Sequence, residues 1–289
     1  MSGEPGCSSD ACGLRLWEAV AAQLSGDDTG RFATVLEGIP SSLRAAAIGW
    51  RNPRDKGRTP LHLAAIGGAD DILRALLREA QPGQVDARDD DLETPLHYAA
   101  CFSNSFVLST LIEYGADVQA KDRNGASPLH MAALWNRSRN ANLLLSHQAV
   151  IDSRDVVGQT PLHWAVTGVI SGFETVVGLL DHGADIESRT QDGRTALHLA
   201  ALKDRHLKSL EVLIDSGGDI EGRDDDGHTA LHWTARFNAR RNLVLLLSKG
   251  ADRASKDRDG KTAYDLARND DMKRLLREFT TTDSYSTQR

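Results

Sequence analysis

The sequence predicts an all-α repeat solenoid, in which pairs of short helices stack on one another through hairpin-like loops. A tetrapeptide of the form Thr/Ser-Pro/Ala-Leu-His occurs six times, and a degenerate copy, Thr-Ala-Tyr-Asp, follows. The seven copies begin at residues 59, 94, 127, 160, 195, 229 and 262, so that neighbouring copies are always 33–35 residues apart. A fixed period of this length is typical of stacked supersecondary units, each too small to form a core alone.

The tetrapeptide predicts the start of the first helix in every unit. Thr or Ser suits an N-cap, and Pro suits the first helical position, where no backbone N–H is needed. Apolar residues follow at a helical spacing, as with Leu61, Ala64 and Ala65 in the first copy. These residues form one narrow stripe, and the alanines in it allow a neighbouring helix to approach closely.

A second apolar segment predicts the partner helix of each unit. In the second unit it contains Leu108 and Leu111, and it ends at Gly115. Glycine at this position is the usual left-handed stop signal of a helix. A stretch containing Asp and Gly, such as 121–125, then turns the chain into the next tetrapeptide. The predicted unit is helix, tight loop, helix and hairpin-like turn.

On these motifs, the chain resembles the ankyrin repeat family over residues 55–278. The resemblance implies about seven stacked repeats with projecting β-hairpin loops, and a concave groove lined by the first helices and the hairpin tips. It also implies a non-enzymatic scaffold or adaptor that binds a partner protein, although a fold alone does not identify that partner. The sequence departs from the family pattern at Leu92 and Gln148, which replace glycines, and by extra residues near 168–171 and 204–206.

The two ends of the chain lack the tetrapeptide. Residues 14–54 are predicted to form a divergent helical N-terminal cap, with two short helices in 14–39 and a further helical turn in 40–50. A solenoid needs such a cap because its terminal repeat would otherwise expose an apolar face. Residues 1–13 and 279–289 are polar and are predicted to be disordered.

Composition excludes several classes of function. The 289 residues carry a net charge of −7, which argues against nucleic-acid binding. No apolar run approaches the roughly 18 residues of a membrane span. Three cysteines, Cys7, Cys12 and Cys101, are too few for a disulfide framework and indicate reduced thiols. We therefore expect a cytoplasmic monomer, with a nuclear location left open.

Ten histidines raise the possibility of metal chemistry, but six of them belong to the tetrapeptide. Each of these lies three residues after its N-cap, where its ring can bond turns within and between repeats. Successive copies lie about one stacking distance apart, too far to share an ion at about 2.1 Å per ligand. The Asp runs 89–91 and 224–226 each follow an Arg at a hairpin, which favours bonds between hairpins over Ca²⁺ binding. We expect no metal and no cofactor.

Large apolar residues seven and eight positions after the Thr/Ser are the main evidence for a binding surface. This helix face is expected to be exposed, and large apolar groups on such a face mark interaction sites. The predicted anchors are Phe102, Trp135 and Phe237, supported by Leu134 and Leu202. The residues predicted to tune charge and register are Arg236 and the hairpin-tip residues Arg58, Glu93, Arg194, His228 and Lys261. Four positions after the Thr/Ser, the residues predicted to pack between neighbouring helices are Leu63, Tyr98, Met131, Trp164, Leu199 and Trp233.

Other functions stay open at this point. The chain has no Gly-x-Ser-x-Gly, phosphate-binding loop or His-Glu-x-x-His motif, so we predict that it is not an enzyme. The alternative is a small-molecule site or an unconventional enzyme in the same groove. Its candidate residues are Arg194, Lys203, His206, Asp226, His228 and Arg236. A regulatory fragment of a larger protein and self-association through the aromatic residues are further alternatives.

Overall fold

The computed structural model describes residues 8–26, 31–169 and 173–279. The chain divides into two compact units, the first comprising 1–132 with 142–149 and the second comprising 133–141 with 150–289. Within the described ranges the structure is helical and contains no strand. The predicted β-hairpins are therefore turns, and isolated antiparallel bridges occur at Asn52–Arg58 and Lys256–Thr262.

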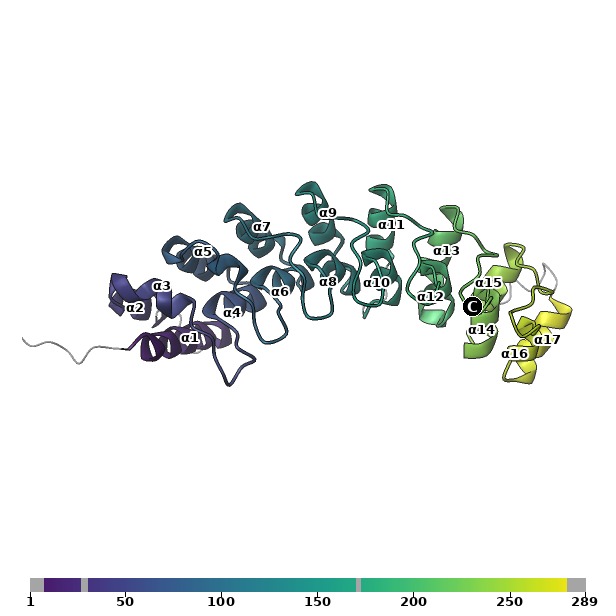
Figure 1. The fold of residues 1–289 in the computed structure, drawn as a ribbon, viewed down its shortest axis with the longest axis horizontal. Coiled ribbons are helices and arrows are strands. Elements are labelled where there is room, and N and C mark those ends of the chain that lie inside the picture. The colour runs from purple at the N-terminus through teal and green to yellow at the C-terminus, as the bar shows by residue number, and fades with distance from the viewer. Residues whose placement is uncertain (1–7, 27–30, 170–172, 280–289) are drawn as a thin grey trace, which may run out of the picture. The chain divides into compact units, whose positions relative to one another are not determined.

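In the first unit, helices form two layers. The helices are α1 (Ser9–Ser25), α2 (Arg31–Gly38), α3 (Ser41–Ile48), α4 (Pro60–Gly67), α5 (Asp70–Glu79), α6 (Pro95–Cys101) and α7 (Ser105–Glu113), with a 3₁₀ turn η1 (Gln84–Asp86). Helix α4 packs against α6 and α5 packs against α7, so first helices contact first helices and second helices contact second helices (Figure 1). Helices α8 (Pro128–Leu134) and α9 (Ser138–Ser146) contribute residues to both units.

The second unit repeats this two-layer arrangement. Its helices are α10 (Pro161–Thr167), α11 (Glu174–Asp181), α12 (Ala196–Ala201), α13 (Leu207–Asp215), α14 (Ala230–Phe237), α15 (Arg240–Ser248), α16 (Ala263–Leu266) and α17 (Asp270–Glu278), with a 3₁₀ turn η2 (Asp204–His206). Helices α10, α12, α14 and α16 contact one another in that order (Figure 1). Helices α11, α13 and α15 form the second layer in the same way. The insertion predicted near 168–171 falls partly on 170–172, which lie outside the described residues.

The N-terminal segment is more helical than the sequence predicts. Helix α1 begins at Ser9, inside the segment 1–13 predicted to be disordered, because the hydroxyl of Ser8 caps it by accepting the N–H of Ala11 at 3.2 Å. The turn predicted in 40–50 is the complete helix α3. Helix α1 packs against α3 and α4. Cys12 is buried and disulfide-bonded, which corrects the expectation of reduced thiols at this position. Residues 1–7, with Cys7, and 280–289 lie outside the described ranges.

The tetrapeptide caps the first helices as predicted. In all six histidine-containing copies the backbone N–H of the Thr or Ser donates to Nδ1 of the histidine at 3.1 Å. In the degenerate copy, Oδ2 of Asp265 accepts the N–H of Thr262 at 2.8 Å in the same way. The Leu and Ala stripe beneath the cap, including Leu61, Ala64 and Ala65, is fully buried. A short helix therefore begins at a fixed residue and presents a fixed face to its neighbours.

The same histidines join successive repeats. Because Nδ1 accepts a backbone N–H, the ring proton lies on Nε2, which donates to a carbonyl in the following loop. His62 bonds the carbonyl of Glu93 at 3.0 Å, and His163 bonds that of Arg194 at 3.2 Å. Equivalent bonds run from His97 to Ala126, from His198 to His228 and from His232 to Lys261. These bonds confirm a structural role for the repeated histidine.

The loops themselves are held by a buried aspartate and by bonds between neighbouring loops. Oδ1 of Asp89 accepts the N–H groups of Asp91 and Glu93 at 2.9 Å each. The same pattern recurs at Asp122, Asp155, Asp224 and Asp257. Between loops, Lys56 pairs with Asp91 at 3.0 Å and Arg88 donates to the carbonyl of Lys121 at 2.8 Å. The predicted bonds between hairpins are confirmed in these loops.

Candidate partner-binding site

An aromatic side chain ties the first helix to its preceding loop in three repeats. The hydroxyl of Tyr98 donates to Oδ2 of Asp89 at 2.8 Å. Nε1 of Trp164 and of Trp233 donate at 2.9 Å to Oδ2 of Asp155 and of Asp224, respectively. These residues lie four positions after the Thr and were predicted to pack between helices. Their polar atoms instead point to the loop, so the rings lie where helix and loop meet.

Trp233 is the centre of a cluster in the second unit. The guanidinium carbon of Arg194 lies 4.3 Å from the centroid of the indole, and that of Arg236 lies 5.6 Å from it. The ring of Phe237 stacks on the indole with centroids 5.6 Å apart and planes inclined by 24°. His228 contacts the same indole at 5.3 Å between centroids. Four of the predicted site residues therefore converge on a tryptophan that was not predicted to be part of the site.

Burial distinguishes the roles of these side chains. Trp233 is 6% exposed and serves as the platform, whereas Phe237 is 49% exposed and presents its outer surface to solvent. Arg194 is half-buried, and its Nε forms no hydrogen bond within the described part of the chain. A cation over an indole face and an offset aromatic pair are both favourable arrangements, and they hold Arg194 and Phe237 in place. The cluster offers an apolar ring beside two guanidinium groups.

A polar pocket of about 420 Å³ borders this cluster on the side of the last loop. Its lining includes Asp226, His228, Arg236, Arg258 and Lys261. Within the described residues, Arg236 and Arg258 form no ion pair, whereas Lys261 pairs with a loop aspartate at 3.3 Å. His228 is buried between two carboxylates, with Nδ1 3.4 Å from Asp224 and Nε2 3.5 Å from Asp257. The pocket brings together three predicted residues, His228, Arg236 and Lys261.

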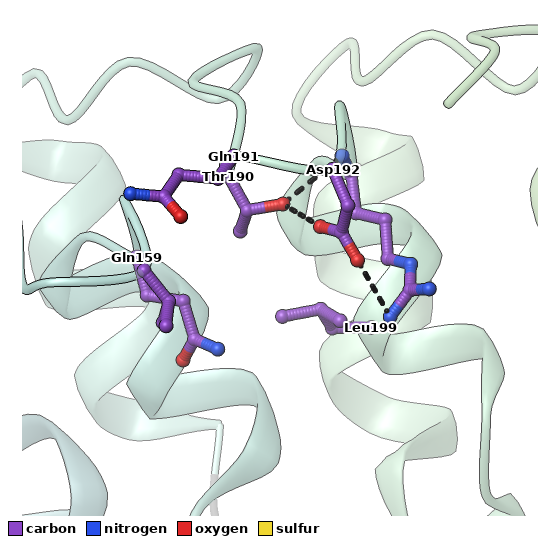
Figure 2. A pocket seen from close by; sticks show the side chains of 7 residues that line it. Gln159, Thr190, Gln191, Asp192 and Leu199 are labelled. Atoms are coloured by element: carbon purple, nitrogen blue, oxygen red, sulfur yellow. Dashed lines mark hydrogen bonds and ion pairs between the residues drawn. The ribbon is translucent and has the colours of Figure 1, made fainter. Parts of the chain in front are cut away.

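A second pocket of about 410 Å³ lies between the loops that precede α10 and α12 (Figure 2). Figure 2 shows Gln159 on one side, Thr190 and Asp192 on the other, and Leu199 beneath them. Asp192 pairs with Arg194 at 3.0 Å, so the pocket adjoins the cluster around Trp233. Its apolar surface comes from the buried Leu199 and from Val157, which is 46% exposed at a loop tip.

The first unit contains a smaller arrangement of the same kind. Nε of Arg58 donates to the hydroxyl of Tyr98 at 3.1 Å, and its guanidinium lies 4.9 Å from the ring centroid. Glu93 is half-buried beside this pair, and burial raises the pKa of its carboxyl. Phe102 ends α6 and is 38% exposed. The predicted residues Arg58, Glu93 and Phe102 thus belong to one segment, 58–102, with Tyr98 as the added member.

Three of the predicted residues lie in neither the cluster around Trp233, nor the polar pocket, nor the arrangement in the first unit. Leu134 and Trp135 are half-buried at the end of α8, where the carbonyl of Leu134 accepts the N–H of Val169 at 2.9 Å. Leu202 is half-buried and ends α12. Their partner contacts therefore stay predictions.

Of the six residues named for a catalytic or small-molecule site, Arg194, Asp226, His228 and Arg236 lie in the cluster or the polar pocket, whereas Lys203 and His206 lie in another loop. His206 lies in η2 beside Lys203, and its Nε2 accepts the Nε of Arg205 at 2.9 Å. Burial lowers the pKa of His206 to about 4. Within the described ranges no hydrogen bond or ion pair joins His206 to Arg194, Asp226, His228 or Arg236. The loop around η2 instead supports the next repeat, because Asp204 accepts the N–H groups of Arg241 and Asn242.

The described part of the chain contains no group of three or more His, Cys, Asp or Glu side chains arranged to hold a metal ion. None of its helices is long and apolar enough to cross a membrane.

The tetrapeptide, the paired helix layers and the linked loops agree with comparisons to known proteins. A family model of ankyrin repeats in three copies matches residues 21–122, 119–190 and 168–257. The chain belongs to the ankyrin repeat family. Ankyrin repeats are general protein–protein interaction modules, and their fold is typically non-enzymatic.

Two similar proteins carry the same fold or part of it. The crystal structure of the human ASB11 ankyrin repeat domain matches with a TM-score of 0.67 and 26% sequence identity, covering 76% of this chain and 96% of that domain. Inversin from Canis lupus familiaris is 32% identical over 69 residues, which is 24% of this chain. The match spans only 6% of the length of inversin.

Proposed function

We propose that this ankyrin repeat protein is a non-enzymatic scaffold or adaptor that binds a partner protein on the surface formed by Arg194, Trp233, Arg236 and Phe237. The observation that carries the proposal is the stack on Trp233, where a half-exposed phenylalanine lies beside two guanidinium groups. Aromatic and arginine side chains on a well-packed platform are typical of interface hot spots.

The rigidity of this surface supports the same proposal. The carbonyls of Arg194 and His228 accept histidine bonds from the preceding repeats, so the backbone at these loop ends is fixed before any partner arrives. Oδ1 of Asp224 holds the loop that carries His228, and Oδ2 holds Trp233. A prearranged surface loses little conformational entropy on binding. The first unit offers a second contact region at Arg58, Glu93 and Phe102, and Leu134, Trp135, Leu202 and Lys261 remain further proposed contacts.

Affinity capture from the native cell extract tests the proposal. We expect Phe237→Ala to remove or sharply weaken at least one captured protein, because truncating a hot-spot ring costs roughly 2 kcal/mol or more. The matched control is Phe106→Ala, which removes a ring that is 72% exposed in α7 of the first unit. An unchanged set of partners for Phe237→Ala would contradict the proposed surface.

A further inference from the structure

We propose that the partner presents an extended segment with two anchors, an apolar side chain and a carboxylate about six residues apart. The apolar side chain enters the pocket over Leu199, and the carboxylate enters the polar pocket beside Arg236 and Arg258. This inference rests on the proposed function and specifies the chemistry of its partner.

The pocket in Figure 2 fits the apolar anchor. Its base is the side chain of Leu199, which is buried and points into the space between the two loops. Val157 adds apolar surface at the rim, although a loop tip is usually polar. Asp192 and Arg194 pair with each other across one wall, so their charges are already compensated. A neutral side chain of moderate size therefore loses less hydration free energy on entering this pocket than a charged one.

The polar pocket fits the carboxylate. Arg236 and Arg258 line it without an ion pair in the described ranges, and Lys261 adds a third cation. The opposing carboxylates are largely committed: Asp257 is buried and bonds two backbone N–H groups, and Asp259 pairs with Lys261. Asp226 remains as one exposed carboxylate against two unpaired guanidinium groups. The lining carries three carboxylates and three cationic side chains, but the guanidinium groups of Arg236 and Arg258 form no ion pair in the described ranges and can donate charge-assisted hydrogen bonds to an acidic side chain.

The distance between the pockets sets the spacing of the two anchors. The apolar pocket lies at the loops before α10 and α12, and the polar pocket lies at the loops before α14 and α16. The two sites are thus offset by two repeats, or about 20 Å at about 10 Å per pair of packed helices. An extended chain advances about 3.3 Å per residue, which gives about six residues. Arg194 lines the apolar pocket, Arg236 lines the polar pocket, and both lie over Trp233, so the intervening residues would pass the cluster whose exposed ring is Phe237.

Fluorescence anisotropy with synthetic peptides tests this inference on the full chain. The reference probe carries one leucine and one glutamate six positions apart in a neutral, extended background. Three matched probes replace the glutamate by glutamine, replace the leucine by serine, or place the two residues two positions apart. We expect the reference probe to bind about tenfold more tightly than each matched probe, since one charge-assisted hydrogen bond, or the burial of one leucine side chain, is worth about 1.5 kcal/mol or more.

Variants of the protein assign the two pockets. The double variant Arg236→Gln/Arg258→Gln should abolish the preference for glutamate over glutamine, and Val157→Ser should reduce the preference for leucine. Arg241→Gln is the matched control, because Arg241 is an exposed arginine on α15 that lines neither pocket. The Arg241→Gln variant should prefer glutamate over glutamine and leucine over serine to the same extent as the unmodified protein.

Several results would overturn the inference. Equal affinity for glutamate and glutamine, equal affinity at both spacings, or no binding of any probe up to about 1 mM would each reject it. If the capture experiment still shows dependence on Phe237 while the peptides show no preference, only the chemistry assigned to the partner is wrong. If capture is also independent of Phe237, the proposed binding surface fails as well.

Discussion

The capping histidines should make the stability of the repeat stack depend steeply on pH. His62 and His97 are fully buried, and burial lowers the pKa of each to about 4. Each neutral ring accepts a backbone N–H at Nδ1 and donates from Nε2 to the next loop. Protonation adds a hydrogen to Nδ1, so the charged ring can no longer accept the bond that begins its helix.

The sign and size of the effect follow from the two pKa values. An unfolded histidine titrates near 6.5, so below this pH the unfolded chain binds more protons than the folded chain. Stability is therefore complete above about pH 6.5 and is lost as the pH falls toward 4. A shift from 6.5 to about 4 amounts to a loss of roughly 2 kcal/mol per histidine at about pH 5, or roughly 4 kcal/mol for the pair.

Urea unfolding followed by far-UV circular dichroism at about pH 7.5 and pH 5 measures this loss. The informative variant is His62→Gln/His97→Gln, since glutamine can accept the N-cap N–H but does not titrate. We expect this variant to be less stable at the higher pH by roughly 2 kcal/mol, because two bonds to the next loops are lost. Between the two pH values it should lose roughly 4 kcal/mol less than the unmodified protein. An identical loss in both proteins would refute the assignment of the pH dependence to these histidines.

Three further substitutions probe the loops and the site. Asp224→Ala should lower the free energy of unfolding by roughly 3 kcal/mol, because it leaves two loop N–H groups and Nε1 of Trp233 without an acceptor. Tryptophan fluorescence during urea unfolding measures the change, and a near-neutral result would contradict the prediction. Leu92→Gly should raise the melting temperature, because Leu92 has a φ of 62° that costs a leucine about 1 kcal/mol. A lower melting temperature would show that the contacts of the leucine side chain stabilise the protein by more than this backbone strain costs. Phe237→Ala should change the free energy of unfolding by less than about 1 kcal/mol, as should Phe106→Ala, because the two residues are 49% and 72% exposed, respectively. A larger loss for Phe237→Ala would assign that ring to the core.

The architecture was predictable because each step depends on a local, repeated signal. A Thr at an N-cap, a Pro at the next position and a His three residues after the cap determine where a helix begins, whatever surrounds it. The bond from Nε2 to the next loop requires successive units to stack in register, which the nearly constant repeat length indicates. The start of α1 at Ser9 was missed because nothing repeats there: its cap is Ser8, within a polar stretch that also contains Gly and Pro.

The candidate site could be predicted only in part from the sequence, because the cluster around Trp233 depends on contacts between two segments. The sequence suggested Arg194, Arg236 and Phe237, which vary among repeats, but treated Trp233 as ordinary packing. A signal was present, since a hydrogen-bonding aromatic residue follows the loop aspartate by nine residues in three copies, for example Asp224 and Trp233. This spacing can be interpreted only once the loop is seen to fold over the helix, which brings Nε1 of Trp233 to 2.9 Å from Oδ2 of Asp224. Because the sequence pattern recorded Trp233 only as an apolar residue, it did not reveal the hydrogen bond of its indole N–H.

The geometry of the loops explains how the same loop residues can stabilise the repeat stack through their backbone and still offer side chains for the proposed partner contacts. Glu93, Arg194, His228 and Lys261 each precede a tetrapeptide, and each gives its backbone carbonyl to the histidine of the preceding repeat. A carbonyl is available whatever the side chain, so these positions can hold an acid, a base or a ring without loss of the bond between repeats. The side chain next to that carbonyl lies beside the first helix, where it can line a pocket, as Arg194 and Lys261 do. The bond between repeats thus fixes the backbone of the residues whose side chains we propose to contact a partner.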